Sequence, residues 1–366
     1  MRRLIATLTL AAFLGACPGL AVAAEAEVVG SGPELTLNAA ITLALEHSRT
    51  IKKAELTVEK AEKSREQAET ALTFTPILGQ TYDAEVESAW YNLLTADLSW
   101  RMSKRQADQA EDALVLQVCQ LYWNVQAATE GLELARVAAE QAERQARVAR
   151  AAYQVGTVSS VDAAQAEHAR EQAQIAVEQA ERAVETAYLE LNNALGLDVD
   201  VRPVPVDRPE FSPLEVVDLE QEVARVMATS PSVWLAEQQL TLQTYKQQMI
   251  YATGTYTSYE LRRIEKQETE LEVANTKDQV RQQVRKLYLA VRNLESSYRK
   301  ALAERDQAAE GLRVARAKFE AGMATTTEVR AKELALAQAE ASVNDLVRQH
   351  AYYKLLFQKP WAAGGA

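Results

Sequence analysis

Apolar and polar positions follow a heptad spacing over two long stretches, with alanine at the repeating apolar position. Steps of four and three residues alternate in the first stretch, at Ala135, Ala139, Ala142, Ala146 and Ala149. Beyond a glycine turn the same spacing recurs at Ala166, Ala169, Ala173, Ala176, Ala180, Ala183 and Ala187. A sustained heptad pattern predicts long helices that supercoil side by side. Because alanine buries little area, such a seam favours close approach of two backbones.

Two other regions change the period. Leu94–Met102 alternates strictly between apolar and polar residues. Period two predicts a strand, and about nine residues is also the length of a tilted membrane-spanning strand. Leu72–Tyr82 is a candidate partner, so the first strand region is about 72–103, although Ala84–Leu94 fits a helix equally well. The corresponding region of the second half, Met249–Leu261, has room for a short hairpin or for one strand stub.

Proline marks the boundaries between segments. None occurs between Pro76 and Pro203 or between Pro231 and Pro360, and both spans are rich in good helix formers. Leu197–Asp218 holds four prolines and reads as an extended connector. We therefore divide the chain into a signal peptide, a first repeat, a connector, a second repeat and a tail: 1–24, 35–197, 198–218, 219–358 and 359–366.

The same short turn occurs twice. "YQVGTVSSVD" (Tyr153–Asp162) and "FEAGMATTTE" (Phe319–Glu328) each follow the string "RVARA", and one offset of 166 residues aligns them. A glycine at positive φ ends the first helix of each pair, and Ser or Thr side chains cap the second. Asp162 and Glu328 would lie in the first turn, where an acid suits the positive helix end. We predict two helical hairpins with small polar tips at 154–161 and 320–327.

These tips have two readings. They could be a docking surface for a partner protein, or they could simply close the hairpins. The repetition favours docking as much as closure, and the exposed side chains expected for Val158 and Met323 favour docking. The candidate docking residues are Gly156, Thr157, Val158, Ser159, Ser160, Gly322, Met323, Ala324, Thr325 and Thr326, with the tip acids Asp162 and Glu328.

Composition and motifs exclude several functions. Among 366 residues the formal net charge is -11, and Lys and Arg are interspersed with Asp and Glu. Nucleic-acid binding is therefore disfavoured, because phosphate recognition needs a basic face. The three histidines lack ligand spacing, and the chain has no phosphate loop, dinucleotide turn or nucleophile elbow. We expect no enzyme activity, no metal and no cofactor.

The N-terminus has the form of a secretory signal. Arg2 and Arg3 precede the apolar run Leu4–Ala16, and the small residues of Ala21–Ala26 favour cleavage near position 24. A second reading is a lipobox at "LGAC", in which Cys17 would be lipidated. The first reading is favoured because Gly15, two residues before Cys17, is an atypical choice in a lipobox and the competing cleavage site is good.

Taken together, these segments resemble the TolC-type outer-membrane efflux proteins. The resemblance rests on "LTLNAAITLALEHSRTI", the two tips, and the repeat endings "LNNALGL" and "AYYKLLFQ", and it covers about Leu35–Phe357. It implies a mainly α fold, with two tandem helical-hairpin repeats whose long coiled-coil helices form an α-barrel in a homotrimer. The family also places a β-barrel in the outer membrane. This chain departs from the pattern because its strand portion is small and shortened.

The resemblance also implies a function. Members are passive export ducts of tripartite efflux or type I secretion systems, located in the outer membrane and periplasm. Their tips meet a periplasmic adaptor that joins an inner-membrane pump, and docking opens the duct. The shortened strands leave an alternative open, a non-conducting coiled-coil spacer or lipoprotein of the cell envelope with the same fold.

Overall fold

The computed structural model describes residues 32–72, 83–216, 218–249, 251–254, 256–364. The expected signal peptide and Cys17 lie outside them. The described residues form two copies of one helical unit, which confirms the mainly α fold. The first copy comprises α1 (Leu37–His47), α2 (Arg49–Thr70), α3 (Ala84–Gln154) and α4 (Ser160–Leu195). The second comprises α5 (Leu219–Thr229), α6 (Pro231–Gln248), α7 (Tyr259–Glu320) and α8 (Thr326–Gln358), followed by a 3-10 turn, η2 (Pro360–Gly364).

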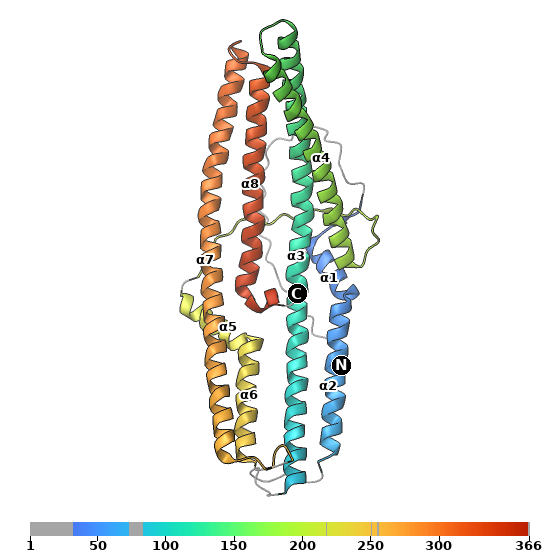
Figure 1. Cartoon of the computed structure of the whole chain (residues 1–366), viewed down its shortest axis with the longest axis vertical. Helices are drawn as coiled ribbons and strands as arrows, with labels where there is room; N and C mark the ends of the chain where they lie inside the picture. Colours follow the sequence, from blue (N-terminus) through green and yellow to red (C-terminus); the bar gives the residue numbers. More distant parts are fainter. Residues whose placement is uncertain (1–31, 73–82, 217, 250, 255, 365–366) are drawn as a thin grey trace, which may run out of the picture.

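The long helices α3 and α7 run the whole length of an elongated molecule (Figure 1). At 1.5 Å per residue, α3 is about 107 Å long and α7 about 93 Å. In the upper half α3 packs on α4 and α8, and α8 packs on α7. In the lower half α3 packs on α2 and α6, and α6 packs on α7. Each half is therefore a row of four helices.

One serine separates the short helix from the next helix in each repeat. Ser48 ends α1 and caps α2, and Ser230 ends α5 and precedes α6. Both have extended backbones, with ψ of 118° and 124°, so the helix is interrupted for a single residue. Ser48 Oγ accepts a hydrogen bond from the Ile51 N–H at 3.3 Å, whereas Pro231 begins α6 directly. The two serines bend the chain at mid-height in both repeats.

A two-stranded parallel sheet ties the connector to the first repeat at mid-height. It pairs β1 (Glu34–Leu35) with β2 (Val204–Pro205). The fully buried Tyr122 of α3 donates its hydroxyl to the Leu35 carbonyl at 2.7 Å and accepts the Asp207 N–H at 2.9 Å. The Tyr122 hydroxyl therefore holds both the connector and strand β1 against α3.

The strand predicted over Leu94–Met102 is wrong, because these residues lie inside α3. Nine alternating positions also fit a helix here, since Ala96, Trp100, Ser103 and Ala107 are spaced by four, three and four and are all at least half-buried. Salt bridges also stabilise the helix here, because Asp97 pairs with Arg101 of its own helix at 2.8 Å and with Arg65 of α2 at 3.3 Å. Of the expected partner strand, residues 73–82 lie outside the described part.

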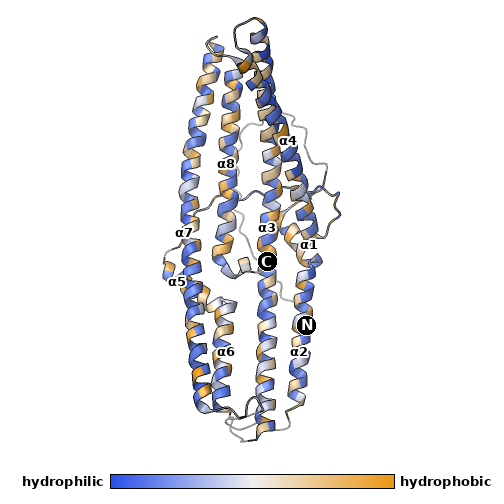
Figure 2. Cartoon of the chain, in the orientation of Figure 1, coloured by the Kyte–Doolittle hydropathy of each residue, from blue (hydrophilic) through white to orange (hydrophobic). Residues whose placement is uncertain are grey.

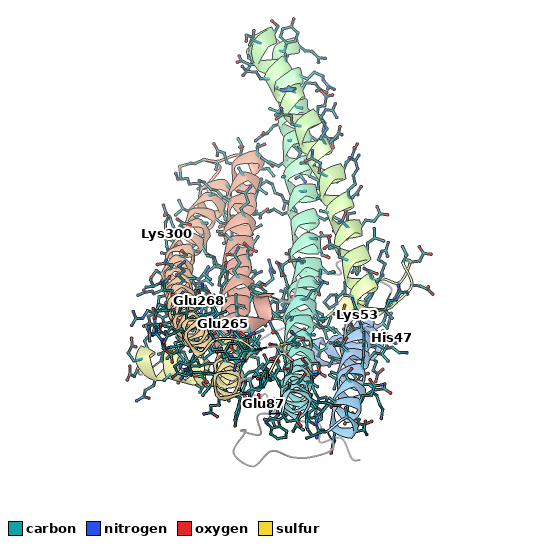
Figure 3. The ribbon with its side chains drawn as sticks, turned by 60° about the horizontal axis from the view of Figure 1, so that its bottom comes forward. His47, Lys53, Glu87, Glu265, Glu268 and Lys300 are labelled. Atoms are coloured by element: carbon teal, nitrogen blue, oxygen red, sulfur yellow. The ribbon has the colours of Figure 1, made fainter. Side chains whose placement is uncertain are left out.

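The strand stub expected over Met249–Leu261 is also not formed in its described residues. The backbone turns over Tyr251–Gly254, and α7 begins at Tyr259. The buried Glu87 of α3 holds this turn by accepting the Tyr251 N–H at 2.6 Å, and Figure 3 shows Glu87 at this end of the molecule. A side-chain carboxylate thus takes up a backbone donor that a strand would pair with its neighbour.

Hydrophilic and hydrophobic residues are interleaved along the described helices (Figure 2). Within the described ranges, every helix is too short or too polar to cross a membrane.

Candidate docking tips and helix seams

The two tips lie at the same end of the molecule (Figure 1). Each has one glycine in the left-handed region, Gly156 with φ 77° and Gly322 with φ 72°. In each, the residue after the glycine donates its N–H to the carbonyl five residues earlier: Thr157 to Ala152 at 2.9 Å and Met323 to Lys318 at 2.8 Å. Such a bond takes up a carbonyl left unpaired at the helix end. The two tip turns, 166 residues apart, therefore have the same backbone hydrogen bonds.

A capping box begins the second helix of each hairpin. Ser159 Oγ accepts the Asp162 N–H at 3.2 Å, and the Asp162 carboxylate accepts the Ser159 N–H at 3.3 Å. Thr325 and Glu328 repeat this exchange at 3.2 and 3.0 Å. Ser159 and Thr325 are thus the caps, while Ser160 is the first residue of its helix. The tip acids satisfy backbone donors of their own helix ends.

Exposure differs among the candidate docking residues. The exposure expected for Val158 is wrong, since Val158 and Ala324 are half-buried; the rest are exposed, Met323 at 74%. Val155, which is not among the predicted docking residues, is equally exposed at 74% and lies directly before Gly156. The sequence signal for Val155 is its place directly before the turn glycine in "YQVG". Val155 in the first tip and Met323 in the second are therefore the most exposed large apolar side chains of their tips, ahead of Val161 and Phe319.

An open groove of about 530 Å³ lies beside the second tip. Its lining includes the apolar Val314, Met323 and Ala324 and the charged Lys318, Glu328 and Lys332. A groove of mixed apolar and charged character suits a polypeptide side chain better than a buried small molecule.

The repeated "RVARA" string has a structural counterpart near the tips. Its second arginine crosses each hairpin, with Arg150 pairing to Glu167 at 2.7 Å and Arg316 to Glu333 at 2.9 Å. Neighbouring arginines also lower the pKa of both carboxyls: that of Glu167 through Arg170 first and then Arg150, and that of Glu333 through Arg316 and then Arg330 despite some burial. We call these pairs the tip clamps. The string is evident in the sequence, whereas its pairing across the hairpin is not.

The alanines of the predicted seam are all at least half-buried on α3 but only in part on α4. Ala135, Ala139, Ala142 and Ala149 are half-buried, and Ala146 is buried. On α4 the half-buried or buried positions include Ala166, Ala173, Ala180 and Ala187, but the intervening contacts come from Arg170, Val177 and Val184. Three of the predicted seam residues are exposed within this chain: Ala169, Ala176 and Ala183. Because Val buries more apolar area than Ala, α4 turns its valines toward α3.

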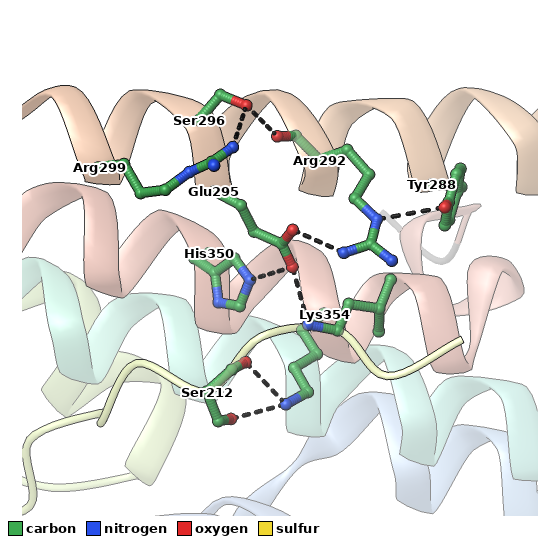
Figure 4. Close-up of polar contacts among 9 residues, drawn as sticks. Ser212, Tyr288, Arg292, Glu295, Ser296, Arg299, His350 and Lys354 are labelled. Atoms are coloured by element: carbon green, nitrogen blue, oxygen red, sulfur yellow. Dashed lines mark hydrogen bonds and ion pairs between the residues drawn. The ribbon is translucent and has the colours of Figure 1, made fainter. Parts of the chain in front are cut away.

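A buried polar cluster holds the connector on the second repeat at mid-height (Figure 4). The Glu295 carboxylate accepts the Leu214 N–H at 2.7 Å and an Arg292 N–H at 2.8 Å. His350 Nε2 lies 3.7 Å from Glu295, and Lys354 donates to Ser212 at 2.7 Å. Burial raises the pKa of Glu295, but the donors at Leu214 and Arg292 outweigh it and hold that pKa low. Burial lowers the pKa of His350, which Glu295 raises only in part.

Comparison with known proteins identifies this architecture. Residues 91–197 match the family described as Outer membrane efflux protein. No curated protein sequence matches the chain significantly.

Solved structures match over both repeats. A membrane protein from Pseudomonas aeruginosa has a TM-score of 0.68 at 16% identity, over 89% of this chain and 90% of that one. The Campylobacter jejuni CmeC outer membrane channel gives 0.66 at 15%, over 90% and 85%. The open state of the Neisseria gonorrhoeae MtrE outer membrane channel gives 0.64 at 16%, over 90% and 89%. The chain thus matches the outer membrane efflux protein family over residues 91–197 and has the fold of solved outer membrane channels across both repeats.

Proposed function

We propose that this chain forms a homotrimeric, passive export duct, the outer-membrane component of a tripartite efflux or type I secretion system. The observation that carries the proposal is the bond-by-bond repetition of the two tips at one end of the molecule. Three copies would present six similar tips in a ring, which a periplasmic adaptor with repeated binding sites could engage. The family match over residues 91–197 supports the same assignment.

Docking at the tips would open the duct. The exposed Val155 and Met323 offer apolar contacts to an adaptor, and the groove beside the second tip offers a recess. The tip clamps hold each hairpin closed through exposed ion pairs, which a docked partner can exchange for its own charges. Energy would come from the inner-membrane pump, since the sequence holds no nucleotide-binding motif.

Planar-bilayer conductance of the detergent-purified mature protein tests the proposal, with its mass measured by light scattering. We expect a trimer that gives discrete conductance steps. If the trimer is silent because its gate is closed, removal of both clamps through Arg150→Gln and Arg316→Gln should produce steps. A protein that is not trimeric and conducts in neither form would contradict the duct and support the envelope spacer.

A further inference from the structure

The second half of the connector is bonded to three helices of both repeats at mid-height. The Asp207 N–H is bonded to α3, and the Leu214 N–H is bonded to Glu295 of α7. Between them, Ser212 accepts two hydrogen bonds from α8, at its carbonyl and at its hydroxyl. Residues 207–216 therefore hold the second repeat against the first in addition to joining them covalently.

One carboxylate oxygen lies between two nitrogens that could donate to it. Glu295 Oε1 accepts the Leu214 N–H at 2.7 Å, and His350 Nε2 lies 3.7 Å from the same oxygen. The second distance is too long for a hydrogen bond, and in the described part of the chain this buried nitrogen has no partner. Arg292 binds the other oxygen, Oε2, at 2.8 Å. A hydrogen gained at His350 Nε2 would therefore compete for the oxygen that holds the connector (Figure 4).

Ring packing ties the position of His350 to the connector. Phe211 of the connector stacks on Tyr298 of α7, with ring centroids 3.8 Å apart, and its ring centroid lies 4.8 Å from that of His350. His350 is only 1% exposed, so its ring has little room to move alone. A shift of His350 toward Glu295 would therefore disturb the connector both at its backbone bond and at the Phe211 stack.

The surrounding charges decide when His350 binds a proton. Burial lowers its pKa, Glu295 raises it in part, and Lys354 lowers it further. Once the connector leaves, water reaches the ring and its pKa returns toward the ordinary 6.5. The released state therefore binds the proton more readily than the closed one, so acid favours release. Charged groups on the elements around His350 include Glu295 and Arg292 of α7, Arg348 and Lys354 of α8, Glu130 of α3, and Arg208 of the connector.

We propose that His350 is an acid-operated release for the connector, in which its protonated Nε2–H takes Glu295 Oε1 from the Leu214 N–H. Both ring nitrogens of a protonated imidazole are donors. Because both partners are then charged, the imidazolium binds the carboxylate more strongly than the neutral Leu214 N–H does. Release frees α7 and α8 from the connector at mid-height. This device goes beyond the proposed duct and depends neither on assembly nor on conductance.

Hydrogen exchange of the mature protein at pH 7.5 and 5.5, followed by mass spectrometry, tests the release. Rates are divided by the intrinsic rate at each pH, so that protection factors are compared. Residues 210–216 report on the release because they contain the Leu214 amide. Residues 202–207 are the internal reference, since Tyr122 and backbone pairing with β1 hold them. We expect protection at 210–216 to fall roughly five- to tenfold, as one proton shifts the opening equilibrium up to about tenfold per pH unit below 6.5.

Two substitutions of His350 separate protonation from packing. His350→Phe keeps a ring that cannot be protonated, so 210–216 should stay protected at both pH values. His350→Gln supplies a neutral donor at every pH, so protection should be lower than in His350→Phe and independent of pH. His168→Phe, at an exposed position of α4, is the control and should respond like the wild type, and circular dichroism checks that each variant folds.

Three results would overturn the release. The first is equal wild-type protection of 210–216 at both pH values, and the second is an equal fall in His350→Phe. The third is an equal loss at 202–207, which would mean that acid opens the whole mid-height region rather than the Glu295 end of the connector. A fall confined to 210–216 and absent from both His350 variants supports it.

Discussion

At the scale of single residues, His350 gives the buried cluster a defined response to pH. Burial holds the pKa of His350 below the ordinary 6.5, although the nearby Glu295 carboxylate raises it. The other charged groups around His350 are Arg292 and Lys354. The unfolded chain therefore binds the proton more readily than the folded one. Neutral His350 contributes stability above pH 6.5, and that contribution is lost as the pH falls through 6.5 toward the folded value. The low pKa of Glu295 acts only below its ordinary 4.5.

We therefore expect thermal stability to fall between pH 7.5 and pH 5.5, and His350→Phe to reduce that fall. Phenylalanine keeps the ring beside Phe211, whose centroid lies 4.8 Å away, but it cannot be protonated. Melting temperatures from circular dichroism at both pH values measure the effect. His168→Phe, at an exposed position of α4, is the control and should leave the pH dependence unchanged. Equal slopes for wild type and His350→Phe would show that another group is responsible.

At the scale of elements, the tip clamps should decide how tightly each hairpin end is held. Arg150→Gln with Arg316→Gln removes the charge that crosses each hairpin. We expect amide exchange at residues 150–167 and 316–333 to rise roughly two- to fivefold, in line with exposed ion pairs, and the mid-height core to stay protected. Hydrogen exchange followed by mass spectrometry resolves both regions.

The first arginine of each "RVARA" string supplies the control for this experiment. Among the residues that the structure describes, Arg147 and Arg313 pair only within their own helices, with Glu143 at 3.5 Å and Glu310 at 2.6 Å. Replacing both by Gln removes the same charge without loosening a hairpin, so exchange at the tips should stay near the wild-type rate. If both double variants accelerate exchange equally, net charge rather than the cross-hairpin contact sets tip dynamics.

The helices and turns also show which parts of the fold can be predicted from the sequence alone. The two glycines and their acids predicted the tip turns, because positive φ and capping are local properties that few residue types satisfy. The helix over Leu94–Met102 was missed because nine residues are too few to distinguish period two from the period of a helix. The exposure of Ala169, Ala176 and Ala183 has another cause. Heptad spacing fixes a broad stripe, and only the partner helix decides which side of that stripe it contacts.

The docking role of the tips could not be predicted with the same security as their turns. Ser159 and Thr325 act as caps, which accounts for their residue type without a partner. Exposed apolar residues such as Val155 point to a partner, but exposure depends on the tertiary arrangement of the hairpins. The tip clamps likewise join residues 17 positions apart through a turn, a pairing that emerges only once the hairpin closes.

At the scale of the whole molecule, the C-terminal turn η2 joins the two repeats. Gln109 of α3 donates to the Trp361 carbonyl at 3.1 Å, and Gln283 of α7 donates to the Pro360 carbonyl at 3.1 Å. Trp361 Nε1 donates to Asp112 of α3 at 2.9 Å. One short segment is therefore bonded to both long helices, where α8 ends and α6 begins. Loss of this junction should let the upper and lower rows move independently.

Trp361→Ala should accordingly lower stability by about 2 kcal/mol, less than the ~3–5 kcal/mol for a fully buried Trp, because this side chain is only half-buried. The melting temperature should fall by several degrees, and amide exchange should rise at the end of α8 and the start of α6 while the tips keep their rates. Lys359→Ala is the control, because Lys359 also pairs with Asp112 but is half exposed and adds little packing. If both variants lower the melting temperature equally, the ion pair rather than the tryptophan joins the repeats. A fall in stability with uniform exchange along α3 would mean that the two rows open as one unit and that η2 is no junction between them.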